Sequence, residues 1–198
     1  MSVFGRTFLI EDCFEYFPEF LNPDEADRFL ASLWNELNWM QAEITMFGRK
    51  VMQPRLIAWY GDPGANYAYS GLSLNPRPWH PVLLELKARI EAVTAGRFNS
   101  VLANAYRNGR DSMGWHRDDE KELGPRPTIA SLSLGAERRF LVREKGRKSS
   151  GLALEHGSLL LMQGDCQARF QHSLPKTQRE TGLRINLTYR DIRSQAPV

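Results

Sequence analysis

From residue 96 onward the chain consists of short segments in which apolar and polar residues alternate, and this feature constrains the fold most. The segments are FNSVLANAYR, IASLSLG, RRFLVR, GLALEHGSLLLMQGD and LRINLTYRDI, separated by Gly, Pro and Asp turns. A period of two is typical of β-strands, and the absence of helices between them favours antiparallel sheets over βαβ units. About eight such strands predict a jelly-roll-like double sheet, a double-stranded β-helix.

Two helical segments precede these strands, so the opening third reads as helical. LNPDEADRFLASLWNEL has Asn22 as its expected N-cap and Pro23 at the first helical position. Its helical spacing predicts a buried stripe of Ala26, Phe29, Leu30, Leu33, Trp34 and Leu37. A second helix is expected to begin at Pro81, with a buried stripe of Leu83, Leu86, Ile90 and Val93. These helices are expected to buttress one face of the double sheet, giving an α+β, mainly β fold.

The composition fits one globular domain. A length of 198 residues suits a single domain, residues 1–198, with an N-terminal part over about 1–95 and a jelly-roll core over about 96–192. The sequence has no apolar run long enough for a bilayer and no signal-peptide pattern at its start. Cys13 and Cys166 lack C-x-x-C spacing and are expected to be reduced packing thiols. We therefore expect a soluble intracellular protein, cytoplasmic if bacterial, with no membrane partner and a monomer as the default.

Positive charge gathers in one short segment. The formal net charge of +3 and the pI of about 9.0 are compatible with a polyanionic partner without requiring one. The clustered cations are Arg138, Arg139, Arg143, Lys145, Arg147 and Lys148. Such a segment is either a solvated hairpin tip or a phosphate-facing patch.

GWHRDDE, residues 114 to 120, holds a candidate metal site. His116 and Asp118 are two residues apart, so both face the same side of an extended segment, and His172 offers a third ligand. Two imidazoles and one carboxylate form the facial triad that holds Fe(II) and leaves positions open for O₂ and a bidentate co-substrate. Taken alone, each histidine is consistent with an ordinary turn or core residue that binds no metal. Zinc is an alternative on these ligands alone, because hydrolytic zinc sites use the same set.

The last strand, RINLTYR, favours iron. One face carries Arg184, Asn186, Thr188 and Arg190, and the other carries Ile185, Leu187 and Tyr189. A solvated polar face would have no functional meaning. If that face lies beside the triad, its arginines would bind a carboxylate in a bidentate manner. The dicarboxylate 2-oxoglutarate fits such a row as the co-substrate of an iron oxygenase, whereas a hydrolytic zinc enzyme has no need of it.

These motifs together resemble the AlkB family of Fe(II)- and 2-oxoglutarate-dependent nucleic-acid dealkylases. The resemblance covers about residues 50 to 192 and rests on Asn104 and Tyr106, HRDDE, HSLP and RINLTYR. PRLIAWYGD, YSGLSLNPRPWHPVL and HGSLLLM are similar to the branch that contains the human nuclear repair dioxygenases. The resemblance implies a double-stranded β-helix with an N-terminal nucleotide-recognition lid.

The resemblance also implies roles for individual residues. Iron would be held by His116, Asp118 and His172. The co-substrate would contact Asn104, Tyr106, Arg184, Asn186 and Arg190, with Thr188 beside them. Within this set, Arg184 would lie near the chelated end or the substrate, and Arg190 would bind the distal carboxylate.

Further residues would contact a flipped base. Tyr67, Tyr69 and Ser70 match positions that border the base, and Asp119 and Glu120 match acidic positions at its edge. The alternatives are a loop anchored by tyrosines and a pair of solvated acids.

Phe47 and Arg49, in ITMFGRK, are similar to a hairpin that wedges into a duplex. An apolar wedge flanked by cations suits base flipping, since unstacking needs a filler and phosphates need cations. A plain turn is the alternative.

The expected function is oxidative demethylation of bases such as 1-methyladenine and 3-methylcytosine in DNA, with RNA as a further candidate substrate, releasing formaldehyde and succinate as direct-reversal repair. One alternative keeps Fe(II), 2-oxoglutarate and O₂ but acts on a protein, a lipid or a small molecule. Another is a non-catalytic nucleic-acid-binding module, which an intact triad and arginine row disfavour.

Overall fold

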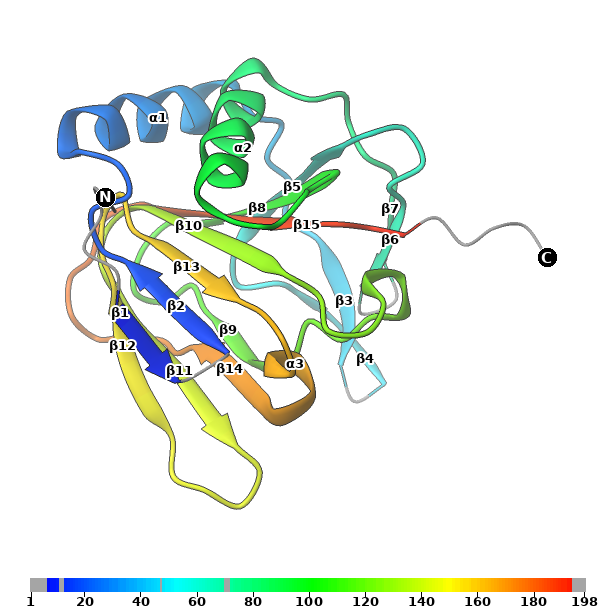
Figure 1. Ribbon diagram of the computed structural model, residues 1–198, viewed down its shortest axis with the longest axis vertical. Coiled ribbons are helices and arrows are strands. Elements are labelled where there is room, and N and C mark those ends of the chain that lie inside the picture. The colour runs from blue at the N-terminus through cyan, green and yellow to red at the C-terminus, as the bar shows by residue number, and fades with distance from the viewer. Residues whose placement is uncertain (1–6, 11–12, 47, 70–71, 194–198) are drawn as a thin grey trace.

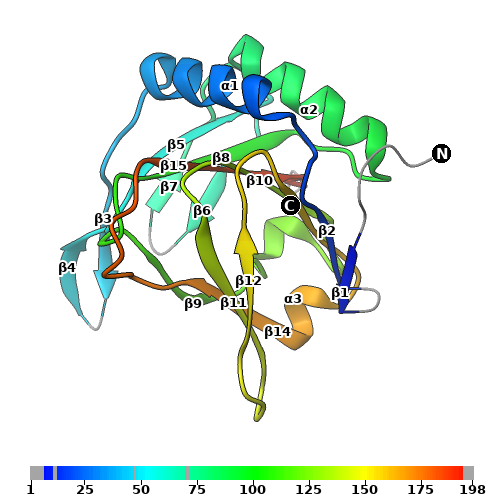
Figure 2. The same ribbon diagram turned by 90° about the vertical axis from the view of Figure 1, so that its left-hand side faces the viewer.

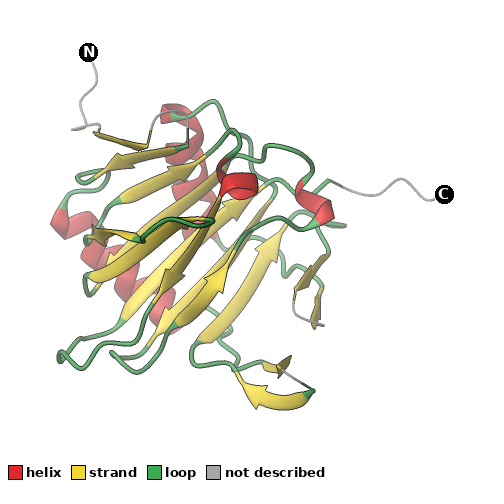
Figure 3. Cartoon of the chain, turned by 90° about the horizontal axis from the view of Figure 1, so that it is seen from below, coloured by secondary structure: helices red, strands yellow, loops and turns green. Residues whose placement is uncertain are grey.

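Two antiparallel sheets face each other in the computed structural model, which describes residues 7–10, 13–46, 48–69 and 72–193 (Figure 1). The seven-stranded sheet has the order β1 (Thr7–Ile10), β2 (Phe14–Phe17), β13 (Leu159–Met162), β10 (Ile129–Gly135), β15 (Arg184–Arg190), β8 (Ser100–Tyr106) and β5 (Leu56–Gly61). The four-stranded sheet has the order β12 (Ser150–Leu154), β11 (Arg138–Glu144), β14 (Phe170–Leu174) and β9 (Met113–His116). Figure 3 shows the strands of the two layers from below. The predicted double-stranded β-helix is confirmed.

Both predicted helices form and cover the outer face of the seven-stranded sheet (Figure 2). α1 spans Pro23–Glu36 and α2 spans Pro81–Val93. The side chain of Asn22 accepts a hydrogen bond from the Glu25 backbone N–H at 2.9 Å, which confirms the predicted N-cap. Within the described residues, no helix is both long and apolar enough to cross a membrane.

The predicted apolar stripes are largely correct. The two helices bury Ala26, Phe29, Leu33, Leu83, Leu86 and Ile90 against the sheet. Leu30 and Val93 are only partly buried. The assignment of Trp34 to the core is wrong, because its side chain is 37% exposed and its ring lies 6.1 Å from that of Trp39 at the edge of the helix contact.

A second core fills the space between the two sheets. It contains Phe14, Ile57, Leu102, Ile129, Phe140, Leu154, Leu160 and Met162. Cys13 and Cys166 are buried in this core as packing thiols, as predicted. The interior of the jelly roll is therefore largely apolar, and a polar group buried there needs a hydrogen-bond or charge partner.

The reading of the opening third as helical is incomplete, because this part of the chain also supplies strands. β2 pairs with β13 and β5 pairs with β8, so both extend the large sheet. Two hairpins, β3 (Glu43–Met46) with β4 (Arg49–Met52) and β6 (Tyr67–Tyr69) with β7 (Leu72–Leu74), lie beyond the main sheets (Figures 1 and 3). Most of these strands have three or four residues, too few alternations to be recognised in a sequence, and the six-residue β5 is buried on both faces and does not alternate.

Two short helical turns interrupt the strands where none was expected. They are the 3₁₀ turn η1 (Lys121–Leu123) and the single-turn helix α3 (Cys166–Arg169). Both stand next to residues of the candidate metal site, and α3 leads directly into β14.

Arg138 does not belong to the exposed basic segment in which the sequence placed it. It is 3% exposed, and its Nη2 donates to the carbonyl oxygens of Asp111 at 2.9 Å and Pro175 at 2.7 Å. The exposed cations of the segment, such as Lys145 and Lys148, stand at the tip of the β11–β12 hairpin.

The side chain of Asp111 closes the loop between β8 and β9. Its carboxylate accepts hydrogen bonds from the backbone N–H of Arg107 at 2.9 Å and from two nitrogens of the Arg107 guanidinium at 2.8 and 3.0 Å. Burial favours a higher pKa for this carboxyl, but the charge and hydrogen bonds of Arg107 outweigh it and hold the pKa below its ordinary value.

We expect Asp111→Asn to lower the free energy of unfolding at neutral pH by about 1–3 kcal/mol, because buried partners lose their acceptor. The contribution of Asp111 is present in full above the ordinary carboxyl pKa of about 3.9 and is lost as the pH falls through its lower folded-state pKa. Denaturant unfolding at neutral and acidic pH measures this. Asp165→Asn, at an exposed ion pair with Arg126, is the control and should change little. Equal losses at both pH values would contradict the assignment.

Candidate metal centre

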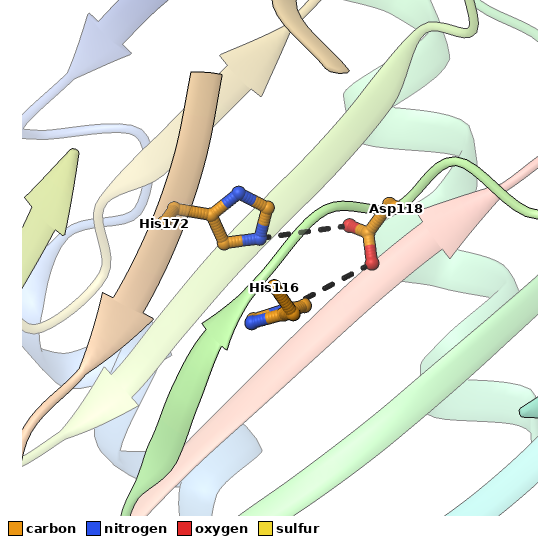
Figure 4. Close-up of side chains that lie close together, drawn as sticks. All are labelled: His116, Asp118 and His172. Atoms are coloured by element: carbon orange, nitrogen blue, oxygen red, sulfur yellow. Dashed lines mark ion pairs between the residues drawn. The ribbon is translucent and has the colours of Figure 1, made fainter. Parts of the chain in front are cut away.

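The neighbouring residues His116 and Asp118 meet His172, which is more than fifty residues further along the chain, inside the jelly roll (Figure 4). One ligand atom from each of His116, Asp118 and His172 lies within 4.8 Å of the others. Nε2 of His116 is 4.0 Å from Oδ1 of Asp118, and Nε2 of His172 is 3.9 Å from Oδ2. These separations exceed hydrogen-bond length, so the three groups converge on a shared point without bonding one another.

Strand pairing brings the two histidines together. His116 ends β9 and is the register partner of His172 on the neighbouring strand β14. Their ring centroids are 4.2 Å apart. Nδ1 of His116 lies 2.9 Å from the carbonyl oxygen of Gly114, which fits a ring that donates from Nδ1 and keeps Nε2 free to ligate. The predicted common side for His116 and Asp118 is confirmed.

Two buried groups hold Asp118 in place. Nη2 of Arg190 donates to its Oδ1 at 2.8 Å, and both side chains are about 5% exposed or less. The backbone N–H of Asp118 donates to Oε1 of Gln167, on α3, at 2.9 Å. Gln167 is itself buried. Asp118 is thus held through its carboxylate by the large sheet and through its backbone by α3.

The protonation states of the three groups suit metal ligation. Burial lowers the pKa of His172 to about 3 and lowers that of His116, so both rings are neutral at neutral pH. Burial alone would raise the pKa of Asp118, but the Arg190 charge and the two imidazoles hold it below its ordinary value. Metals bind neutral imidazole and ionised carboxylate, so these residues fit a divalent ion, and the set matches the facial triad of non-haem Fe(II).

A polar wall continues from the triad along β15. The side chains of Arg184, Asn186, Thr188 and Arg190 all line the same cavity as the triad, and all are buried. Ile185, Leu187 and Tyr189 face the core under the helices. The predicted division of this strand into a polar and an apolar face is confirmed.

The two arginines stand in the opposite order to the one implied by the resemblance. Arg190 lies at the metal end, against Asp118. Arg184 is the register partner of Tyr106, its guanidinium lies 5.2 Å from that ring, and its Nη2 donates to Ser133 at 2.9 Å. Arg184 and Arg190 stand at opposite ends of the extended strand β15. Arg184 is therefore the arginine that lies farther from the metal triad.

Three comparisons with known proteins agree with this geometry. The sequence profile of the 2OG-Fe(II) oxygenase superfamily matches residues 14–190. The human protein named alpha-ketoglutarate-dependent dioxygenase alkB homolog 3 is 43% identical over 187 residues, covering 89% of this chain and 65% of the relative. The mouse DNA oxidative demethylase ALKBH2 is 42% identical over 180 residues, covering 85% of this chain and 75% of the relative. The chain belongs to the AlkB family.

A solved structure supports the fold of this AlkB-family chain. The structure of OsALKBH1 superposes with a TM-score of 0.67 at 16% identity, covering 94% of this chain and all of that one. The chain spans slightly less than two thirds of the length of the human homolog 3. The cofactors of the family are Fe(II) and 2-oxoglutarate, with O₂ as the oxidant, and the triad fits iron.

The AlkB-type lid residues are only partly described. Phe47 and Ser70 lie outside the described residues, as do the side chains of Tyr67 and Tyr69, although β6 itself forms. Arg49 is exposed at the start of β4. Asp119 and Glu120 follow the ligand Asp118 directly, and Asp119 is exposed.

Sequence reasoning missed two residues that order this site, Arg55 and Gln167. Arg55 is 3% exposed, and its Nε donates to Oδ1 of Asn104 at 2.8 Å. Because the amide oxygen of Asn104 faces Arg55, the amide nitrogen of Asn104 points away from Arg55. Arg55 stands beside an apolar strand in PRLIAWYGD, and an arginine in such a setting was the available signal. Asn186 donates to Ser131 and accepts from Thr188, so its amide is already engaged within the wall.

We expect Gln167→Leu to weaken divalent metal binding by roughly tenfold, because the Asp118 backbone loses the acceptor that orients it. Titration of the metal-free protein with Mn(II), followed by electron paramagnetic resonance, measures the affinity. Gln171→Leu is the matched control, since Gln171 adjoins His172 but bonds to Arg143 on the outer face. The positioning role is wrong if both variants bind Mn(II) equally well.

Proposed function

We propose that this chain removes methyl groups oxidatively from N-alkylated bases in DNA. The observation that carries the proposal is a metal triad that shares one pocket with two buried arginines, Arg184 and Arg190. Nε of Arg184, at the far end, is buried without a hydrogen-bond partner among the described residues. Burial also lowers the pKa of this guanidinium to about 10. A desolvated cation with an open donor favours a bound carboxylate.

In this proposal 2-oxoglutarate lies along β15. Its keto-acid end would stand at the triad, near Arg190, and its distal carboxylate would meet Arg184 and Tyr106. Asn104 would direct its amide N–H groups toward the co-substrate, because Arg55 occupies its oxygen. Asn186 and Thr188 would form the middle of the wall.

The chain's own residues would bind, orient and protect the reactants. His116, Asp118 and His172 would hold Fe(II), whose chemistry couples oxidation of 2-oxoglutarate by O₂, to succinate and CO₂, with insertion of one oxygen atom into a methyl C–H bond. The resulting hydroxymethyl group leaves its ring nitrogen as formaldehyde and restores the base. Arg190 would keep Asp118 ionised and aligned throughout.

Several features support a nucleic-acid substrate. One relative is named a DNA oxidative demethylase, and the chain carries a net charge of +3. Asp119, next to the ligand Asp118, is an exposed carboxylate that would attract a cationic methylated base more than a neutral one. Glu120 would act with it at the edge of the base. Tyr67, Tyr69 and Ser70 would border the base, and Phe47 with Arg49 would fill the vacated stack. RNA is a further candidate substrate.

The first test follows succinate and repaired base together. Protein loaded anaerobically with Fe(II) and 2-oxoglutarate receives O₂ and an oligonucleotide with 1-methyladenine or 3-methylcytosine, and we expect both products in equal amounts. Asp118→Ala should abolish both, because the facial triad loses its carboxylate. Asp27→Ala, at an exposed pair with His156 on the outer helix α1, is the control. Activity retained in Asp118→Ala would contradict the metal assignment, and succinate without repair would indicate another substrate.

The order of the arginines gives a separate prediction. We expect Arg184→Met to raise the KM for 2-oxoglutarate by roughly tenfold or more, since a buried charged contact is worth about 2 kcal/mol or more. Arg190→Met should instead lower metal affinity first, because it removes the partner of Asp118. Steady-state kinetics and Mn(II) titration separate the two effects. Arg179→Met is the exposed control. The reverse pattern would restore the order that the resemblance implied.

A further inference from the structure

An apolar hollow of about 150 Å³ lies between the two sheets, beside the metal centre. Its walls come from four strands: Phe14 on β2, Phe140 and Val142 on β11, Leu152 on β12 and Leu160 on β13. Ser150 alone has a polar side chain among the described residues that line it. Ser150 and Gly151 are exposed, so the hollow reaches the surface at the β12 edge.

The hollow and the metal pocket are consecutive spaces along one interior. Side chains two residues apart on a strand face the same side, so a wall continues from one space to the next. On three strands the first residue of such a pair lines the hollow and the second lines the metal pocket. These pairs are Val142 and Phe140, Leu152 and Leu154, and Leu160 and Met162.

One aromatic ring separates the hollow from a metal ligand. Phe140 lines both spaces, and its ring stacks on that of His172 with centroids 5.3 Å apart at 30°. Val142, on the wall of the hollow, is the register partner of His172. Phe140 is thus the side chain that the hollow and the His172 side of the metal site share.

The lining selects against water and against charged reactants. An ordered water needs two to four polar partners, and Ser150 at the mouth supplies only one polar side chain. An enclosed apolar cavity of about this size binds xenon or benzene, so the inner part of the hollow, lined by Phe140, Leu152 and Leu160, suits a small apolar molecule. 2-Oxoglutarate and nucleic acid are anions, and the cationic wall on β15 stands on the other side of the metal pocket. Among the reactants of the family, O₂ is the small apolar one.

We propose that this hollow binds O₂ and supplies it past Phe140 to the metal centre. The inference rests on the proposed oxygenase function, and no bond changes in the step. It assigns separate entrances to the reactants: the apolar wall of β11, β12 and β13 for O₂, and the polar wall of β15 for the co-substrate.

Xenon tests the hollow without metal, co-substrate or activity. Under xenon pressure, crystals of the metal-free protein should show one xenon atom bounded by Phe14, Phe140 and Leu160. Leu152→Trp should remove it, because the larger ring fills the hollow. Ala153→Trp is the matched control, since Ala153 is exposed and is the register partner of the exposed Arg139. Leu160→Phe serves as a second filling variant if Leu152→Trp does not fold. The absence of xenon from the wild-type hollow would overturn the proposal.

Kinetics then test the occupant. In the Fe(II)-loaded protein we expect Leu152→Trp to raise the KM for O₂ by about threefold or more while the KM for 2-oxoglutarate stays unchanged. An unchanged KM for O₂ in a variant that has lost xenon would overturn the supply role. A wild-type protein with no 2-oxoglutarate turnover would remove the proposed function, and the role of O₂ with it, whereas a xenon site would still establish the gas-binding hollow.

Discussion

The buried contact between Arg190 and Asp118 is the interaction on which the rest of the site depends. It joins the large sheet to the segment that follows β9, at 2.8 Å and out of solvent. A carboxylate at this depth would otherwise tend to be protonated, and it would then be a poor metal ligand. The guanidinium keeps it ionised and engages Oδ1, while Oδ2 lies 3.9 Å from Nε2 of His172. A divalent metal ion bound at this point would therefore meet a carboxylate that Arg190 already keeps ionised.

The sequence alone predicted the parts of the protein that repeat with a regular period. The helix that begins at Pro23, the two faces of β15 and the alternation that makes the jelly roll all follow from local pattern. The triad was also accessible, because His116 and Asp118 share one segment and the chain has few histidines from which to choose a third ligand. β15 shows why this worked: a slip of one residue would bury four polar side chains under the helices.

The parts that could not be predicted depend on contacts between distant segments. Two contacts of this kind join residues that are 49 positions apart: Arg55 with Asn104, and Gln167 with Asp118. No local sequence pattern in either segment indicates which residue it will contact. Arg138 looked like one cation of an exposed cluster, yet its donors serve three carbonyl oxygens from other loops. Which of the two arginines on β15 lies nearer the metal could not be predicted for a related reason. Alternation gives the face of a strand, but only the placement of β9 tells which end meets the metal.

The same alternation also explains how one interior can hold both a polar and an apolar compartment. β15 lines the metal pocket with charged and polar groups, while β11, β12 and β13 line it with Phe140, Leu154 and Met162. The triad stands where these two walls meet. Burying charge on one side is tolerable because Asp118 neutralises Arg190 and the proposed co-substrate would neutralise Arg184, and the other side needs no such compensation. A centre that joins an anionic co-substrate to an apolar gas requires this division of its surroundings, and the strand period supplies it.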